Sequence, residues 1–396
     1  MSAASSQPIA IAGGGIGGLA AALALARRNV RSHIFERRQT FSEDGAGIQL
    51  GPNATKVLTA LGVADLLKPL AATPDALSVH DGTTGRLLAR LPLGDWIRKR
   101  HGAPYWTVHR QDLHGALLDA AKRSSSISLT TSQEVQGFRE DNGIVTAYIG
   151  NGEEQRASGL IAADGLWSNL RSQITPGAAL QPTGKCAYRS VVLSDALPAA
   201  LAANDVHIWL APKTHAVHYP IRAGREIALV VCANQSANAG NWETLAPPAW
   251  QASLVANFPA ELRALFKRAE GWRMWPLQSL VPLEKWSTGA VTVLGDSAHP
   301  VQPFLAQGGA LALEDAATLA HCAALSPGNI AAAFRTYETE RKQRAVRVAR
   351  AAARNGDIYH LSGVMALARN ALLRTAPAAG LMAQYDWLYG WNPIAP

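Results

Sequence analysis

The sequence has few cysteines and no long hydrophobic run. Its three cysteines, Cys186, Cys232 and Cys322, lie far apart in the chain. They are too few and too scattered for a disulfide framework or a metal cluster, so we expect no bound metal and a reducing, cytoplasmic environment. No stretch reaches the about 18 uninterrupted apolar residues of a membrane-spanning helix, and residues 1–7 lack the features of a secretion signal. The sequence predicts no membrane association.

Charged residues are also scarce, at 17% of 396 residues, and Lys and Arg (37) outnumber Asp and Glu (29). The positive side chains are dispersed except between Arg335 and Arg354. We interpret that stretch as a helix whose solvent-exposed face is rich in charged residues, and we predict no nucleic-acid binding. A dispersed positive field is suited to attracting small anionic substrates. The chain length predicts two domains, or one domain with a large insertion.

Glycine is concentrated near the N-terminus. The apolar run at 9–12 is followed by Gly13, Gly15 and Gly18 in the spacing G-x-G-x-x-G. These glycines allow a tight turn, a close approach of backbone to a pyrophosphate, and close helix–strand packing. A helix that begins at Ile16 would direct its first amides and its positive dipole end at the pyrophosphate. The sequence therefore predicts a bound dinucleotide.

A second strand at 30–35 ends at Glu36, which lies at the end of the next apolar stretch. A carboxylate at this position accepts hydrogen bonds from ribose hydroxyls and disfavours a 2′-phosphate. Strand, glycines, helix, strand and acid follow one another in the order of a Rossmann-like unit. The motif does not distinguish FAD from NAD.

The rest of the chain predicts an α/β fold in which the Rossmann-like domain is discontinuous and a second domain is an antiparallel sheet. Residues 73–93 alternate as a hairpin, 180–285 are strand-like and rich in Trp and Pro, and helical spacing marks 110–123, 308–325 and 331–355. We assign to the nucleotide-binding domain residues 1–72, 101–180 and 287–330. The substrate-binding sheet domain is assigned residues 73–100 and 181–286, and the C-terminal helical region residues 331–396.

Two later strands are each followed by a turn that contains an aspartate. Residues 159–163 precede Asp164 and Gly165, and residues 291–294 precede Gly295 and Asp296. A carboxylate at the C-terminal end of a parallel strand can accept a hydrogen bond from a ribose or ribityl hydroxyl. Either motif alone is more often a simple turn, so their value lies in their combination with the glycine motif.

Together these motifs resemble, over nearly the whole chain, the single-component FAD-dependent aromatic hydroxylases with the p-hydroxybenzoate hydroxylase fold. The most similar branch contains salicylate hydroxylase, 3-hydroxybenzoate 6-hydroxylase and 6-hydroxynicotinate 3-monooxygenase. The resemblance also rests on the segments 45–50, 52–54, 107–110, 112–113, 303–310, 314–316, 359–361 and 387–390.

The resemblance implies FAD as cofactor. The adenosine diphosphate half would be held by Gly13, Gly15, Ile16, Gly17, Gly18, Glu36 and Arg37. Towards the flavin, the implied contacts are Gly47, Arg110, Asp164, Asp296, Gly308 and Gly309. In this interpretation Asp296 bonds the ribityl chain and Asp164 belongs to a motif linked to both FAD and the reduced nicotinamide. Amides at Gly308 and Gly309 would stabilise negative charge on the reduced flavin.

The implied reaction is an NAD(P)H- and O2-dependent hydroxylation of a small phenolic aromatic acid or hydroxypyridine through a flavin C4a-hydroperoxide. The protein must orient the ring, exclude water and help the substrate hydroxyl lose its proton. Candidate catalytic residues are His218, Tyr105 and Gln302, and candidate substrate contacts are His215, Tyr219, Pro300 and Phe304.

His218 and Tyr219 are neighbours on one strand, so only one of them can face the ring. We choose His218 as the base, since a histidine that titrates near neutrality suits proton transfer. A buried structural role for His218 is an open alternative.

Two other function classes are compatible with the glycine motif: an NAD-dependent dehydrogenase, and a flavoprotein of the same fold without hydroxylase activity. Bound FAD and substrate-stimulated NAD(P)H oxidation would separate them. The absence of a second glycine fingerprint implies that the reductant docks transiently. The expected partners are a small aromatic substrate, NAD(P)H and O2, in a monomer or homodimer.

Overall fold

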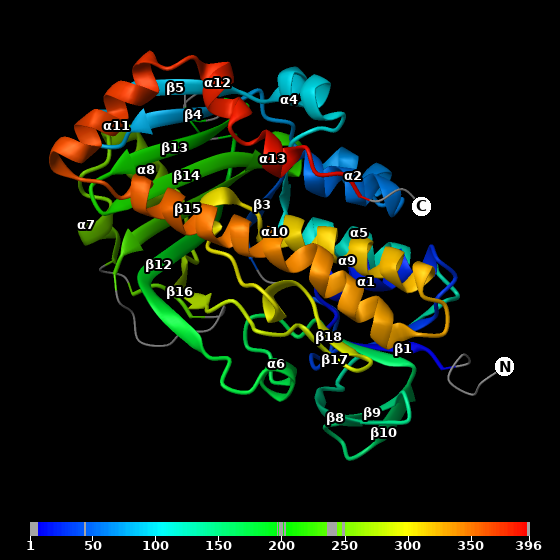
Figure 1. Cartoon of the computed structure of the whole chain (residues 1–396). Helices are drawn as coiled ribbons and strands as arrows, with labels where there is room; N and C mark the ends of the chain where they lie inside the picture. The colour runs from blue at the N-terminus through cyan, green and yellow to red at the C-terminus, as the bar shows by residue number, and fades with distance from the viewer. Residues whose placement is uncertain are drawn as a thin grey trace.

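The computed structural model describes residues 7–42, 45–195, 197, 201, 203–235, 244–247 and 250–393. Two large sheets lie at opposite ends of the molecule, and long helices run between them (Figure 1). Among the described residues, no helix is both long and apolar enough to cross a membrane.

The six-stranded sheet is almost entirely parallel. Its strands are, in sheet order, β17 (Ser287–Thr288), β18 (Val291–Val293), β11 (Gly159–Ala162), β1 (Ile9–Ala12), β2 (Ser32–Phe35) and β7 (Ile127–Thr130). The short edge strand β17 pairs antiparallel with β18. Three separate segments of the chain therefore build one sheet. The second strand begins at Ser32 and not at the predicted residue 30.

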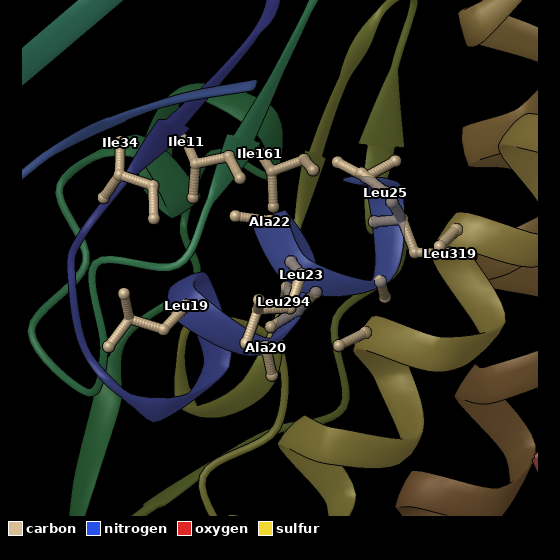
Figure 2. Packing of buried hydrophobic residues seen from close by; sticks show 14 of the residues in the cluster. Ile11, Leu19, Ala20, Ala22, Leu23, Leu25, Ile34, Ile161, Leu294 and Leu319 are labelled. Atoms are coloured by element: carbon tan, nitrogen blue, oxygen red, sulfur yellow. The ribbon is translucent and has the colours of Figure 1, made fainter. Parts of the chain in front are cut away.

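The first helix, α1 (Ile16–Ala26), is apolar along its whole length and is buried against this sheet. Ile11, Ile34 and Ile161 extend from three adjacent strands towards α1 (Figure 2). On its other side, α1 contacts α9 (Gly308–Leu325). A helix that is apolar all round is stable only in such a sandwiched position. The predicted bounds of α9 are confirmed.

The seven-stranded sheet forms the second large layer. Its strands are, in sheet order, β16 (Arg273–Leu280), β12 (Leu180–Leu193), β15 (Glu226–Asn234), β14 (Thr214–Ile221), β13 (Asp205–Ala211), β4 (Ala76–Asp81) and β5 (Leu87–Pro92). The predicted hairpin is confirmed as β4 and β5. The predicted antiparallel pairing of the strands within 180–285 is confirmed, and the hairpin joins this sheet through a parallel pair of β4 with β13.

The tryptophan-rich segment buries most of its described aromatic rings. Two helices that the sequence did not predict, α7 (Trp250–Leu254) and α8 (Ala260–Arg268), enclose a cluster with one face of the sheet. In this cluster Tyr188 stacks on Trp250, with ring centroids 4.3 Å apart. The tryptophans therefore stabilise the sheet domain.

Smaller elements connect these layers. The strands β3 (Gly47–Leu50) and β6 (Trp106–His109) pair with each other, and β8 (Val135–Asp141), β9 (Ile144–Ile149) and β10 (Glu154–Ala157) form a meander. The remaining helices before α9 are α2 (Pro52–Ala60), α3 (Ala64–Leu67), α4 (Gly94–His101), α5 (Arg110–Lys122) and α6 (Leu170–Ile174). The chain continues with α10 (Ile330–Tyr359), α11 (Gly363–Thr375), α12 (Ala378–Ala383) and α13 (Asp386–Tyr389).

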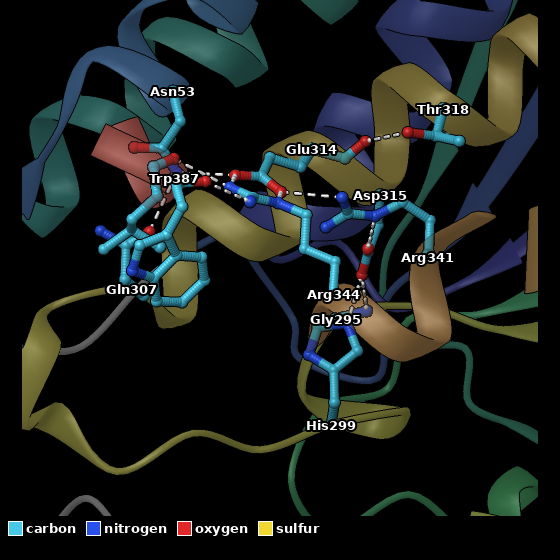
Figure 3. A network of polar contacts seen from close by, with 11 residues as sticks. Asn53, Gly295, His299, Gln307, Glu314, Asp315, Thr318, Arg341, Arg344 and Trp387 are labelled. Atoms are coloured by element: carbon cyan, nitrogen blue, oxygen red, sulfur yellow. Dashed lines mark hydrogen bonds and ion pairs between the residues drawn. The ribbon is translucent and has the colours of Figure 1, made fainter. Parts of the chain in front are cut away.

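The arginine-rich helix α10 has the exposed charged face that the sequence predicted, which includes Arg350, but its other face is buried. It packs along α9 (Figure 1), and Arg341 is only 1% exposed. The Arg341 guanidinium lies 2.8 Å from Glu314 and 2.8 Å from Asp315 of α9 (Figure 3). The sequence did not reveal this buried face, where α10 supplies the cationic partners that two fully buried carboxylates of α9 need.

Replacing Arg341 should destabilise the protein strongly. The change Arg341→Gln leaves two buried carboxylates without their shared cation, which should lower the free energy of unfolding by about 3–5 kcal/mol. Urea unfolding of the FAD-loaded protein measures this loss. The exposed Arg350 of the same helix provides the control, since Arg350→Gln should change stability by less than about 0.5 kcal/mol. Equal effects of the two changes would contradict the proposed importance of the buried pair.

Candidate functional site

One cavity is lined by residues of both large sheets. Its lining includes Ala12, Phe35 and Leu294 at the C-terminal ends of three strands of the six-stranded sheet. It also includes residues of β12, β14, β15 and β16 in the seven-stranded sheet. Ligands of α/β folds bind outside the carboxyl ends of the parallel strands, so this cavity is the candidate active site.

The N-terminus of α1 forms one end of the cavity. Gly13 has a φ of +106°, and a Cβ there would lie 2.4 Å from the carbonyl oxygen of Ala163. A Cβ at Gly18 would lie 2.0 Å from the carbonyl oxygen of Gly13. Within the described residues, the helix has no side-chain cap and no acidic residue in its first turn. Its first amides are therefore available to an anionic group.

Glu36 is held beside these amides. Its carboxylate accepts hydrogen bonds from the backbone N–H of Gly14 at 2.8 Å and of Arg38 at 2.9 Å. These bonds direct the side chain at the end of β2, where it lines the cavity. The position fits a ribose, because each carboxylate oxygen has further acceptor capacity.

A second uncapped helix meets the cavity further along. In the described part of the chain, α9 begins after Gln307 without a side-chain cap and without an acid in its first turn. Asp296 lies near this point, since a Cβ at Gly308 would be 3.9 Å from its Oδ1. Two helix N-termini that attract negative charge thus lie on one cavity.

The two carboxylate turns are joined by residues that the motif analysis did not single out. The Ser297 hydroxyl donates to Asp164 Oδ1 at 2.9 Å and accepts from the Gly165 N–H at 2.8 Å. The buried Arg171 donates to the carbonyl oxygens of Ser297 and Leu166, at 3.2 and 2.9 Å. Ser297 follows Asp296 and Arg171 follows Asp164 closely in sequence. This proximity to the motif aspartates is the sequence pattern that could have identified them.

Almost all residues predicted to bind the cofactor line this one cavity. They are Gly13, Gly15, Ile16, Gly17, Glu36, Arg37, Gly47, Arg110, Asp164, Asp296, Gly308 and Gly309. Gly18 lies beneath the lining, where it allows close packing of α1. One cavity is therefore lined by residues at two uncapped helix N-termini and by the carboxylates of Glu36, Asp164 and Asp296.

Comparison with known proteins identifies the family. The family of the FAD binding domain matches residues 6–352. The chain belongs to this FAD-binding family.

Relatives over the full length are FAD-dependent monooxygenases, and so is this protein. The chain is 36% identical over 386 residues to 3-hydroxybenzoate 6-hydroxylase of Polaromonas naphthalenivorans, covering 97% of this chain and 96% of the relative. It is 33% identical over 345 residues to 6-hydroxynicotinate 3-monooxygenase of Bordetella bronchiseptica, covering 86% and 89%. The crystal structure of Klebsiella pneumoniae HpxO with FAD and uric acid has the same fold, with a TM-score of 0.86, 24% identity and 96% coverage of both chains.

One face of the seven-stranded sheet forms part of this flavoprotein's cavity. Alternate residues of β14, namely His215, Val217 and Tyr219, line the cavity. Tyr219 lies against β3, because a Cβ at Gly47 would be 2.7 Å from the Tyr219 hydroxyl oxygen. Gln302 and Pro300 line the cavity from the loop before α9.

The structure contradicts the prediction that His218 faces the substrate. His218 lies on the opposite face of β14, where its Nδ1 accepts a hydrogen bond from Trp209 Nε1 at 3.1 Å. Its ring stacks on that of His207, with centroids 4.4 Å apart. Strand alternation was applied correctly, but which face meets the cavity depends on how the sheet packs against the flavin domain.

Tyr105 and Phe304 support the cavity from behind. The Tyr105 hydroxyl donates to Gln49 Oε1 at 2.7 Å, and Gln49 lines the cavity. Phe304 is buried, with its ring centroid 5.5 Å from that of His215. Its ring occupies the space beside Gly356, where a Cβ would lie 2.4 Å from it. Neither residue lines the cavity itself.

Arg189 of β12 lines the cavity but was not predicted as a site residue. Its guanidinium carbon lies 5.9 Å from the centroid of the Trp275 ring. Burial lowers the pKa of Arg189 from its usual value, yet a guanidinium stays charged in proteins. Sequence alone did not identify it, because many arginines occur in the chain and only strand pairing shows which one faces the cavity.

Buried histidines should make the protein sensitive to mild acid. Burial is the main cause that lowers the pKa of His80, His207, His215, His218 and His360, to about 4 for His207 and His360. These groups are neutral when folded but take up protons below about pH 6.5 when unfolded. Stability should therefore fall as pH decreases from 6.5, by up to about 1.4 kcal/mol per pH unit for each histidine.

Urea unfolding at pH 7.5, 6.5, 5.5 and 5.0 measures this dependence. The free energy of unfolding of the His207→Gln variant should depend less steeply on pH, because this variant takes up one proton fewer on unfolding. A stability that is constant from pH 6.5 to 5.0 would contradict the neutral state of the buried histidines.

Proposed function

We propose that the protein is an NAD(P)H- and O2-dependent FAD monooxygenase that hydroxylates a small aromatic acid carrying a ring hydroxyl. One observation carries the proposal: the cavity that contains the cofactor-binding motifs ends in a chamber with both an arginine and polar acceptors, Arg189, His215 and Gln302. Such a chamber matches a ring with a carboxylate and a hydroxyl group. The names of the relatives, a hydroxybenzoate hydroxylase and a hydroxynicotinate monooxygenase, support this class of substrate.

The residues of this chain fit FAD. We assign the pyrophosphate to the N-terminus of α1, the adenosine ribose to Glu36 and the ribityl chain to Asp296. The flavin pyrimidine ring is assigned to the first amides of α9, whose dipole favours negative charge there. When bound and reduced by NAD(P)H, FAD supplies the activation of O2 and the transfer of one oxygen atom.

Arg189 is suited to hold the substrate carboxylate. It is a half-buried cation, and its neighbours in the cavity lining on this sheet include the apolar side chains of Val217, Val230 and Leu277. A guanidinium binds a carboxylate through two parallel hydrogen bonds, which orients the ring as well as holding it. The apolar walls exclude water and contact the faces of the ring.

The substrate hydroxyl would meet the polar groups of the chamber. The Gln302 Oε1 is buried and has no hydrogen-bond partner among the described residues, which indicates a ligand group at this position. His215 lines the same cavity, and its pKa is held well below the usual value by burial. A neutral imidazole can accept the hydroxyl proton and make the ring a better nucleophile. Carboxylated hydroxypyridines meet the same requirements.

Substrate-stimulated NAD(P)H oxidation tests the function. Isomeric hydroxybenzoates and hydroxynicotinates are assayed with the FAD-loaded protein, each beside the same ring without its carboxylate. We expect at least one hydroxylated acid to stimulate oxidation and to yield a product with one more hydroxyl group in proportion to NAD(P)H used. NAD(P)H oxidation that forms only hydrogen peroxide with every acid would overturn the proposal.

Removing the arginine should weaken binding of the acid selectively. With Arg189→Met, loss of a charge-assisted hydrogen-bond pair of about 1.5–3 kcal/mol should raise the Kd of the carboxylated substrate roughly 10- to 100-fold. The Kd of the matching phenol should stay nearly unchanged. Perturbation of the flavin absorbance on titration measures both values.

Arg273 provides a matched control. It lies opposite Arg189 on the neighbouring strand β16 but does not line the main cavity. Arg273→Met should therefore leave both Kd values unchanged. If Arg189→Met weakened the acid and the phenol equally, Arg189 would not be the carboxylate-binding group.

A further inference from the structure

His215 begins a chain of hydrogen bonds that leads out of the cavity. Its Nδ1 lies 2.8 Å from Nε2 of His360, and His360 Nδ1 lies 2.6 Å from Oδ1 of Asn234. His215 is 2% exposed and His360 is 6% exposed, whereas Asn234 is exposed at the end of β15. The chain therefore connects a buried ring at the substrate to solvent.

The direction of the hydrogen bonds follows from the chemistry of the groups. An amide oxygen only accepts hydrogen bonds, so His360 must carry its proton on Nδ1 and donate it to Asn234. A neutral imidazole has one N–H, so Nε2 of His360 is an acceptor. His215 must then donate from Nδ1, and its own single N–H is used. Nε2 of His215 is therefore left as a lone pair.

This lone pair is positioned for a substrate. His215 lines the cavity, and its Nε2 has no hydrogen-bond partner among the residues that the structure describes. The backbone holds His360 on two sides, since its N–H donates to the Gly356 carbonyl and its carbonyl accepts from the Lys213 N–H, each at 3.2 Å. The C-terminus of α10 thus fixes the His360 ring beside the seven-stranded sheet.

Burial and nearby cations keep both rings neutral at neutral pH. Burial lowers the pKa of His215 most, followed by His360 and Lys185. For His360, burial again dominates, and Lys185 and Arg369 also lower its pKa while Asp357 raises it. Lys185 and Asp357 form an ion pair with each other, 2.8 Å apart. The histidine pair therefore meets the substrate in the form that accepts a proton.

We propose that His360, oriented by Asn234, is a positioning residue that fixes the tautomer of His215 and so makes Nε2 of His215 the proton acceptor for the substrate hydroxyl. The proposal rests on the proposed function, because it needs a substrate with a ring hydroxyl. The O–H bond of the substrate breaks, an N–H bond forms at Nε2, and the electron pair stays on the phenolate oxygen. The resulting positive charge strengthens the bond from His215 Nδ1 to His360.

The ionisation of bound substrate tests the proposal without turnover. The oxidised, FAD-loaded protein is mixed at pH 7 with a hydroxylated acid, and the phenolate absorption band gives the ionised fraction. His360→Phe removes the acceptor for His215 Nδ1 and should greatly decrease this fraction. His360→Gln supplies an amide oxygen as acceptor and an N–H as donor, and should restore it. If His360 had only a structural role, the ionised fraction of bound substrate would not differ in this way between His360→Phe and His360→Gln.

Turnover gives a second readout. In His360→Phe, kcat should fall about 10²-fold, as for a lost general base, with little change in KM. The rate of this variant should then rise as the pH is raised above 7, because the substrate hydroxyl ionises by itself. The rate of the parent protein should stay constant over the same pH range. His207→Gln, a buried histidine outside the chain of hydrogen bonds, should behave like the parent.

The tautomer can also be measured without any substrate. Imidazole 15N shifts should show His215 protonated only at Nδ1 in the parent and a mixture of both tautomers in Asn234→Leu, an exposed change that keeps both histidines. An unaltered His215 tautomer in Asn234→Leu and His360→Phe would overturn the inference. If the parent shows the expected tautomer but no hydroxylated ring binds, the proposed function fails and the tautomer assignment stands.

Discussion

The buried ion pairs between α9 and α10 hold the flavin site together. Asp315 accepts hydrogen bonds from Gly295 N–H at 3.1 Å and His299 at 2.5 Å, and it pairs with Arg341 (Figure 3). Burial alone would raise the pKa of Asp315, but His299 and Arg341 lower it to about 2. Glu314, the next residue, accepts from Asn53 of α2 at 2.7 Å. These bonds orient the N-terminus of α9 and the turn that carries Asp296.

The cavity separates two kinds of chemistry along its length. At the end formed by the six-stranded sheet, backbone amides and carboxylates come from turns, where glycine allows close approach. At the other end, side chains on the rigid strands of the seven-stranded sheet present Arg189 and His215 with apolar neighbours. The helix α10 serves both ends, since Arg341 binds the flavin-side carboxylates and His360, its C-cap, contacts His215.

Local patterns predicted the elements around the six-stranded sheet well, but they did not show which side chains of the seven-stranded sheet line the cavity. The turn at Gly13–Gly18, the acid at Glu36 and the helix at 308–325 depend on contacts within short segments, so their residues reveal them. Strand alternation likewise separated His218 from Tyr219, but it left two faces to choose between. The choice of His218 was wrong, because the packing of the sheet turns His215, Val217 and Tyr219 towards the cavity.

The sequence by itself therefore determined the cofactor class, the Rossmann-like unit and the set of polar residues available for chemistry. Only the tertiary structure decided which of them meet. Arg189 lies in register with Val230, and Val230 with Val217, on three strands that are distant in sequence. His215 and His360 are 145 positions apart, yet their ring nitrogens lie within 2.8 Å. Such pairings depend on sheet order and helix packing, which are long-range interactions without a local pattern.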